Sequence, residues 1–153
     1  MLKAELKKHF DKNLFLADLQ SDTKKQVLEE LLDLFVSNGY IKDREVVLEM
    51  LHQRETLGST GIGNAIAIPH GRTTAAADVI IAFGRSSKGI KFDAIDKKPV
   101  HLIFMVIAPP NDKGNIYLPI LGSLVTVLNK KENREQLMSI ETFDELMSII
   151  NGE

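Results

Sequence analysis

The segment from Arg54 to Arg72 contains the residue types that bind or transfer an anionic group. It reads RETLGSTGIGNAIAIPHGR and combines an arginine, several glycines and a histidine. Pro69 fixes one backbone angle directly before His70, so this histidine is presented rigidly rather than as a mobile surface side chain. An imidazole held in this way can act as a base, a metal ligand or a phosphoryl acceptor near neutral pH.

A phosphoryl site is the chemistry that suits this combination best. Arg54 offers a planar, permanently charged donor to phosphate oxygens. His70 follows a predicted strand at residues 65–68, and ligands of open α/β sheets bind at the carboxyl ends of strands. Gly71 lets another chain approach without a side chain in the way. We expect no carboxylate of the segment to orient His70 as in a catalytic triad.

The glycines taken alone favour a simpler interpretation, a turn between a helix and a strand. Gly61 and Gly63 begin the pattern of a dinucleotide-binding loop, but Ile66 occupies the third glycine position. The element before them is a predicted helix rather than a strand, and the chain has no Gly-Lys-Ser/Thr sequence of a P-loop. Standard nucleotide binding is therefore not expected.

The other histidines are weaker candidates for chemistry. His9 and His52 lie in polar, helix-like sequence and are expected at the surface. His101 lies in a predicted strand, where it is either buried with one hydrogen bond or directed at the site. A metal shared by His70 and His101 would have only two ligands and no acidic helix motif, so no metal and no cofactor are expected.

Length and composition predict one domain that covers residues 1–153. Hydrophobic residues make up 44% of the chain and charged residues 26%, as in ordinary globular proteins. The formal net charge of -2 gives no bulk attraction to a polyanion, so we expect no nucleic-acid partner. Arg72 and Arg85 are either solvated or part of a basic rim for a partner.

The cysteine count and the N-terminal sequence indicate a cytoplasmic protein. With 0 cysteines the chain has no disulfide, no thiol nucleophile and no thiolate metal site, which fits a reducing compartment. Residues 1–13 are too polar for a signal peptide. The longest apolar run, residues 100–110, is too short to span a bilayer, so no membrane insertion is expected.

Apolar periodicity predicts helices at both ends of the chain and strands in the middle. The predicted helices cover residues 22–38, 43–55, 116–129 and 134–138, and a capping box at residues 142–145 begins a last one. In the second helix we expect four buried side chains, Val46, Val47, Met50 and Leu51. The predicted strands are 65–68, 79–84, 90–92 and 100–107. These elements predict one α/β domain with a central sheet and helices on both sides.

The segment around His70 resembles that of a known family. Arg54, the stretch STGIGN at 59–64 and the stretch AIPHG at 67–71 are similar to the fructose/mannitol-type (type 2) enzyme IIA domain of the bacterial phosphotransferase system. This family includes a nitrogen-regulatory branch. The resemblance spans almost the whole chain and implies an α/β sandwich with a mixed sheet between its helices.

The resemblance also implies a mechanism and a set of partners. An HPr-type phosphocarrier passes a phosphoryl group to the Nε2 atom of the histidine that matches His70, and a IIB domain or protein then receives it on a cysteine. Arg54 matches a family arginine that offsets the phosphoryl charge. Support for the phosphate is implied for loop residues and one asparagine, namely Ser59, Thr60, Gly61, Gly63, Gly71 and Asn115.

Asn115 marks a departure from the mannitol-type pattern. Mannitol-type members carry a second active-site histidine just before the third long helix, where this chain has Asn115. An asparagine can donate a hydrogen bond but cannot carry a charge. The departure weakens an assignment to mannitol transport and leaves the acceptor role of His70 unaffected.

Two functions fit the resemblance, and a third is possible without phosphorylation. The first is a phosphocarrier that feeds a IIB partner for uptake of a sugar of the fructose/mannitol type. The alternative is a nitrogen-regulatory protein whose phosphorylation state controls binding to target proteins, a branch that residues 57–72 resemble especially. The third is a ligand-binding module that is never phosphorylated, which the presence of His70 and Arg54 disfavours.

Overall fold

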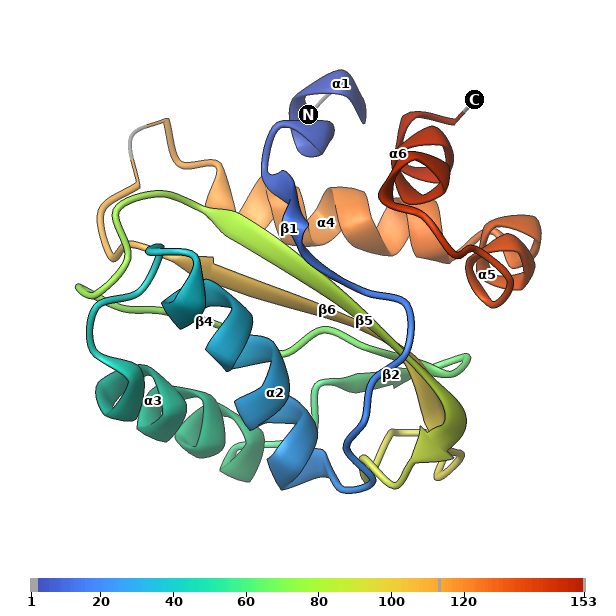
Figure 1. Ribbon diagram of the computed structural model, residues 1–153, viewed down its shortest axis with the longest axis horizontal. Coiled ribbons are helices and arrows are strands. Elements are labelled where there is room, and N and C mark those ends of the chain that lie inside the picture. The colour runs from blue at the N-terminus through green and yellow to red at the C-terminus, as the bar shows by residue number, and fades with distance from the viewer. Residues whose placement is uncertain (1–2, 113, 153) are drawn as a thin grey trace.

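One mixed β-sheet lies between two layers of helices (Figure 1). The computed structural model describes residues 3–112 and 114–152, so residues 1, 2, 113 and 153 of the predicted domain lie outside the described residues. The strands are β1 Phe10–Leu16, β2 Gly61–Gly63, β3 Ile66–Ala67, β4 His70–Arg72, β5 Ile80–Ile90 and β6 Val100–Ala108. The helices are α1 Lys3–Lys7, α2 Lys24–Ser37, α3 Arg44–Thr56, α4 Tyr117–Leu128, α5 Lys131–Leu137 and α6 Phe143–Asn151.

Strands β5 and β6 form the centre of the sheet, where they pair antiparallel. The strand order is β1-β5-β6-β3-β2, and β4 also pairs with β6. Three pairings are parallel, those of β1 with β5 and of β3 and β4 with β6. The predicted mixed sheet is therefore confirmed.

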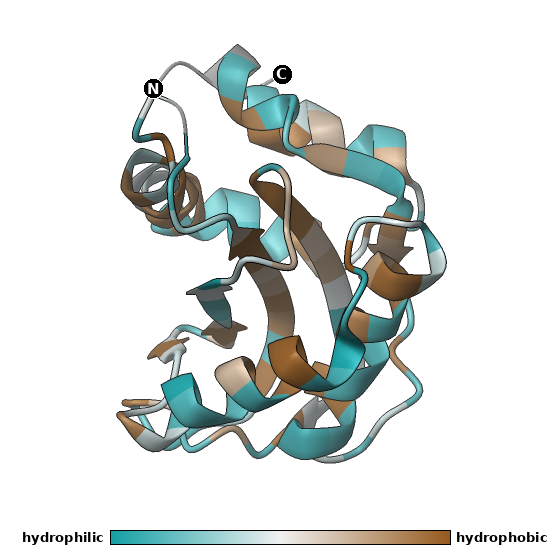
Figure 2. Cartoon of the chain, turned by 90° about the vertical axis from the view of Figure 1, so that its left-hand side faces the viewer, coloured by the Kyte–Doolittle hydropathy of each residue, from teal (hydrophilic) through white to brown (hydrophobic). Residues whose placement is uncertain are grey.

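Both faces of the central strands are buried, as the sequence predicts. Successive side chains of a strand point to opposite faces, so Ile81 and Phe83 enter one core while Ile80 and Ala82 enter the other. Helices α1, α4, α5 and α6 cover the first face, and α2 and α3 cover the second (Figure 1). Figure 2 shows the hydrophobic residues gathered along the central strands.

Helices α2, α3 and α6 each begin at a residue whose side chain caps the helix. The side chain of Thr23 accepts a hydrogen bond from the third residue of α2, and Asp43 does the same for α3. The capping box between Thr142 and Glu145 is present at α6. One prediction is wrong, because Val46 is 51% exposed. The buried stripe of α3 consists of Val47, Leu48 and Leu51, with Met50 half-buried at its edge.

The strands differ from the prediction in several places. The segment 90–92 is not a separate strand, since β5 continues to Ile90, which pairs with Val100. The segment expected at 65–68 is only two residues long in β3. Residues 61–63, expected in a turn, form β2, and neither α1 nor β1 is predicted. In β1 only two residues, Phe10 and Leu14, are buried, too few for a clear alternating pattern.

The sequence prediction for Arg85 is wrong. Arg85 is buried rather than solvated or part of a rim, and it donates hydrogen bonds to the carbonyl oxygens of Leu137, the last residue of α5, and of Ile140. Its charge thus satisfies the carboxyl end of a helix.

Among the residues that the structure describes, no helix combines the length and the apolar character needed to cross a membrane.

Candidate functional site

His70 is the first residue of β4, which runs parallel to β6 and pairs with it from Val106 onward. Strands β3 and β4 both pair with β6, and the residues between them include Pro69, which lacks an amide hydrogen. The carbonyl oxygen of Pro69 accepts a hydrogen bond from the Val106 amide. The histidine therefore lies on a short strand fixed to the sheet centre and not in a loose loop.

The ring of His70 is held in one tautomer. Its Nδ1 atom lies 2.6 Å from the carbonyl oxygen of Ile68. Because a carbonyl oxygen only accepts, Nδ1 must carry the proton, which leaves a lone pair on Nε2 in the neutral ring. Burial lowers the pKa of His70, the bond to Ile68 opposes that shift, and the charge of Arg54 lowers the pKa further. The ring is thus neutral and nucleophilic at neutral pH.

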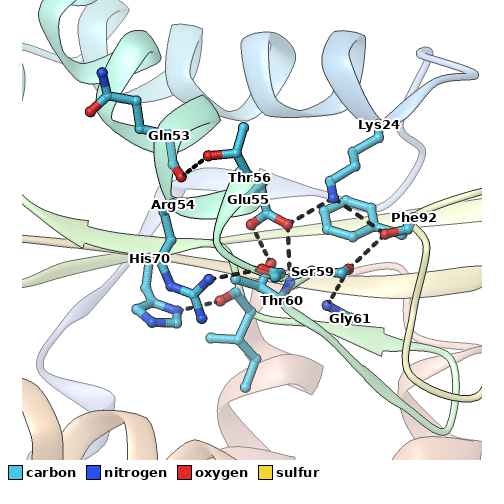
Figure 3. A network of polar contacts seen from close by, with 12 residues as sticks. Lys24, Gln53, Arg54, Glu55, Thr56, Ser59, Thr60, Gly61, His70 and Phe92 are labelled. Carbon is cyan, nitrogen blue, oxygen red and sulfur yellow. Dashed lines mark hydrogen bonds and ion pairs between the residues drawn. The ribbon is translucent and has the colours of Figure 1, made fainter.

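Arg54 lies in the last turn of α3 and belongs to the same site. Its Nη1 atom donates a hydrogen bond to the carbonyl oxygen of Gly58 at 2.8 Å, which folds the guanidinium back over the loop after the helix. Figure 3 shows this guanidinium beside the ring of His70. The structure therefore brings together the two residues that the sequence analysis singles out as the phosphoryl acceptor and its cationic support.

The loop from Ser59 to Gly61 is held by the side chain of Glu55 and by the hydroxyl of Ser59 itself (Figure 3). Glu55 accepts the amide and the hydroxyl of Thr60, at 3.0 and 2.6 Å, and pairs with Lys24 of α2 at 2.9 Å. The hydroxyl of Ser59 donates to the Phe92 carbonyl oxygen at 2.7 Å and accepts the Gly61 amide at 3.0 Å. The amides of Thr60 and Gly61 thus already have partners within the chain.

Two glycines of the segment allow close packing around the histidine. A methyl group on Gly71 would lie 1.9 Å from the sulfur of Met50 in α3. A methyl group on Gly61 would lie 2.8 Å from the Cα atom of Ala94. The space beside Gly71, which was expected to admit another chain, is therefore occupied by α3 of the same chain. Gly63 has a φ of 93°, a conformation that favours glycine.

The start of α4 forms the opposite wall of the site. The ring of Tyr117 lies 6.3 Å from that of His70, and the guanidinium of Arg72 lies 4.7 Å from the Tyr117 ring centre. Burial raises the pKa of Tyr117 to about 12. Asn115 is exposed with a φ of 51°, and Asp112 accepts hydrogen bonds from the first amides of the helix.

The sequence analysis missed three contributors, Tyr117, Glu55 and Lys24. The position of Tyr117, two residues after Asn115, is a signal that could have found it. Glu55 adjoins Arg54, and its burial could not be read from the helical pattern. Lys24 lies 31 positions before Glu55, so only the packing of α2 on α3 reveals their pairing.

The other histidines lie outside the site. His101 was expected either to be buried with one hydrogen bond or to face the site. It is half-buried, and its Nδ1 lies 2.7 Å from the Ser86 carbonyl oxygen, so the first alternative is confirmed. His9 and His52 are half-buried rather than fully exposed, and Nδ1 of His9 contacts the Val79 carbonyl oxygen. No group of three or more possible metal ligands occurs among the described residues.

Comparison with known proteins identifies the family. The model of the phosphoenolpyruvate-dependent sugar phosphotransferase system EIIA 2 family matches residues 8–153. The chain belongs to this family. Its members are phosphotransfer components, and EIIA 2 relatives include both sugar-specific components and nitrogen regulatory proteins.

Curated EIIA 2 relatives of both kinds cover most of the chain. The fructose-specific EIIA component of Haloferax volcanii is 39% identical over 84% of this chain and 82% of its own length. The nitrogen regulatory protein of Pseudomonas aeruginosa is 33% identical over 88% and 87%. The fructose-specific EIIABC component of Bacillus subtilis is 38% identical, and the chain spans about a fifth of that longer protein, 21%.

Solved structures of EIIA 2 relatives confirm the fold. The nitrogen regulatory protein IIA-Ntr of Neisseria meningitidis superposes with a TM-score of 0.88 at 34% identity and covers 95% of this chain and 99% of its own. Enzyme IIA of the Escherichia coli mannitol system, solved in complex with phosphorylated enzyme IIB, gives a TM-score of 0.78 at 21% identity over 94% and 99%. The α/β sandwich with a central mixed sheet is therefore the family fold.

Proposed function

We propose that this protein is a phosphocarrier that accepts a phosphoryl group from an HPr-type protein on Nε2 of His70. It passes the group to a IIB domain or protein for uptake of a sugar of the fructose/mannitol type. The observation that carries the proposal is the 2.6 Å contact between Nδ1 of His70 and the Ile68 carbonyl oxygen, which leaves Nε2 as the free nucleophile. Cytoplasmic localisation is part of the same proposal.

The transfer is a displacement at phosphorus between two nitrogen atoms. The lone pair of Nε2 forms the new N–P bond while the N–P bond of the donor breaks, and the donor imidazole keeps that electron pair. The phosphoryl group brings about two negative charges to His70, by analogy with other protein-bound phosphoryl groups. Arg54 offsets them as a charged donor at the edge of the site.

The remaining site residues support the phosphate in two ways. Ser59, Thr60, Gly61 and Gly63 hold the loop beside Arg54, since the amides of Thr60 and Gly61 already donate inside the chain. Gly71 keeps α3 close to His70. Asn115, exposed just before α4, is a further donor toward the phosphate or toward a partner.

A nitrogen-regulatory role is the second candidate, and one observation favours it. The Neisseria meningitidis regulatory protein matches nearly the full length of both chains at 34% identity. In this alternative the phosphoryl group on His70 changes the surface that target proteins bind, and no sugar need be transported. The chemistry at His70 is the same in both candidates.

Labelling with radioactive phosphoenolpyruvate tests the shared step. With enzyme I and HPr present, the protein should take up one phosphoryl group, and His70→Ala should take up none. His52→Ala is the matched control, because this histidine is half-buried on α3 outside the site. Labelling that persists in His70→Ala would overturn the assignment of the acceptor.

A binding experiment distinguishes the two candidates. Phosphorylated protein is mixed with a IIB protein from the same organism, and the appearance of phosphocysteine on IIB is measured. Transfer supports the transport role. Retention of the phosphoryl group, with target proteins captured by only one of the two phosphorylation states, supports the regulatory role.

A further inference from the structure

Glu55 places a carboxylate in the interior of the site, where its side chain is 6% exposed. Burying a charged group is unfavourable unless the group is paired and hydrogen-bonded. Both oxygens have partners: Oε1 lies 2.9 Å from Nζ of Lys24 and 3.0 Å from the Thr60 amide, and Oε2 accepts the Thr60 hydroxyl at 2.6 Å. The carboxylate is therefore fixed in one orientation.

A continuous series of hydrogen bonds leads from Glu55 to the ring of His70. Thr60, held by Glu55 through its amide and hydroxyl, accepts the Ile68 amide on its carbonyl oxygen at 3.0 Å. The carbonyl oxygen of Ile68 then accepts Nδ1–H of His70 at 2.6 Å. Within Thr60 and within Ile68 the link runs through the covalent backbone, so it transmits position. The carbonyl that sets the tautomer of His70 is thus itself positioned by Glu55.

The same loop is held from its other side by Arg54. The guanidinium donates to the carbonyl oxygen of Gly58, two positions before Thr60. Consecutive residues of α3, Arg54 and Glu55, therefore clamp the two ends of one short loop (Figure 3). Movement of this loop would displace the cation and the acceptor ring together.

We propose that Glu55, neutralised by Lys24, is a positioning residue that keeps the proton of His70 on Nδ1 and its lone pair on Nε2. The kinetic consequence of this inference rests on the proposed phosphoryl transfer, whereas the tautomer itself does not. The charge of Arg54 lowers the pKa of His70 and that of Glu55 raises it, and burial has a larger effect than either.

A purely structural role is the competing explanation. Lys24 and Glu55 join α2 to the end of α3, and a pair of this kind could serve only to pack the two helices together. A packing role predicts lower stability in variants and an unchanged His70 ring. A positioning role predicts a change in the proton distribution of the ring in protein that is still folded.

Nitrogen NMR of the His70 ring separates the two explanations. The ¹⁵N shifts of wild type should report a single tautomer with the proton on Nδ1, and Glu55→Ala should shift them toward a mixture of tautomers. Glu49→Ala, an exposed glutamate on the same helix, is the matched control and should keep the wild-type shifts. Wild-type ring shifts in folded Glu55→Ala would overturn the proposal.

Glu55→Gln covers the case in which the alanine variant fails to fold. Its amide oxygen still accepts from Thr60 but no longer pairs with Lys24, so ring shifts between those of wild type and a tautomer mixture are expected. Lys24→Met, compared with the exposed neighbour Lys25→Met, removes the other half of the pair. Unchanged ring shifts in both Glu55→Gln and Lys24→Met would overturn the proposal in the same way.

Single-turnover transfer from phosphorylated HPr measures the consequence for the reaction. Loss of Glu55 should slow transfer about 10- to 100-fold, the effect of one lost buried hydrogen bond to a charged group, and Glu49→Ala should leave the rate within about twofold. A wild-type rate in Glu55→Ala contradicts the positioning role. If wild type itself takes up no phosphoryl group, the proposed function fails, and the NMR result still decides whether Glu55 positions the ring.

Discussion

His70 and His101 make the same backbone hydrogen bond in two different regions of one sheet. Nδ1 of His70 lies 2.6 Å from the Ile68 carbonyl oxygen, and Nδ1 of His101 lies 2.7 Å from that of Ser86. His101 is the second residue of β6, whereas His70 pairs with Val106 nearer the end of that strand. Both rings are half-buried and both leave Nε2 without the proton in the neutral form.

The difference between the two regions lies in what surrounds each ring. Around His70 the structure gathers a guanidinium and the ring of Tyr117. Around His101 it places the end of β5, where a methyl group on Gly89 would lie 3.0 Å from Nε2. In the proposed function a fixed tautomer is not sufficient for a phosphoryl acceptor, because the added charge also needs a cation and room for a partner.

The largest effect expected from this comparison is on phosphorylation itself. His70→Gln should abolish labelling by phospho-HPr, because glutamine lacks the imidazole nitrogen that accepts the group in the proposed reaction. His101→Gln should label at a rate within about twofold of wild type, as for other substitutions away from a site. Mass spectrometry of the labelled protein locates the phosphoryl group. A phosphoryl group on His101 would show that the backbone hydrogen bond alone selects the acceptor.

The cation should account for the next largest effect. Arg54→Ala should slow transfer about 100-fold while the protein stays folded, because the developing phosphoryl charge loses a preorganised donor. Arg72→Ala is the control of equal charge, since Arg72 is stacked on Tyr117 and should have a smaller effect. Rapid-quench measurement of both rates checks the order. Equal transfer rates for the two variants would show that Arg54 has no greater role in phosphoryl transfer than Arg72.

The glycine next to each ring offers a third comparison, this time of stability. Gly71→Ala should lower the free energy of unfolding by about 1–3 kcal/mol, because its methyl group would lie 1.9 Å from the Met50 sulfur. The loss should be smaller in a Met50→Ala background, where that space is empty. Gly89→Ala should recover less stability in a His101→Ala background, since its methyl group still lies 2.9 Å from Cβ of Pro99 and its φ of 89° remains strained for alanine. Urea unfolding of the single and double variants measures both couplings.

The sequence predicts the helices and the central strands well, because long periodic patterns and caps are local signals. It fails for β1, where the strand is recognised only through its parallel pairing with β5. It also misjudges Val46, which adjoins the buried face of α3 but points to solvent. The local pattern of apolar residues does not show which neighbouring element a helix packs against.

The site divides in the same way between local and distant contributions. His70 and Arg54 are predictable because they lie in one segment with recognisable chemistry. The Lys24–Glu55 pair and the stacking of Arg72 on Tyr117 join residues far apart in the chain, so they depend on tertiary packing. The resemblance implies that Thr60 and Gly61 support the phosphate. Only the folded structure shows that their amide hydrogens already have hydrogen-bond partners within the chain.

The smallest expected effect is a pH dependence of stability from His70. Its pKa is lowered in the folded protein, mainly by burial, from an ordinary value of 6.5. Below that value the unfolded chain binds more protons than the folded one, so the free energy of unfolding should fall as the pH drops from 6.5 toward the lowered pKa. Well above 6.5 the ring is neutral in both states and contributes no slope.

The variant His70→Gln isolates this contribution, because glutamine does not titrate. Urea unfolding of wild type and variant at several pH values between about 5 and 8 gives the two curves, and their difference should be flat well above 6.5 and fall below it. A difference that instead grows on acidification would mean that the folded ring prefers its proton. The hydrogen bond to Ile68 would then raise the pKa of His70 by more than burial and Arg54 lower it.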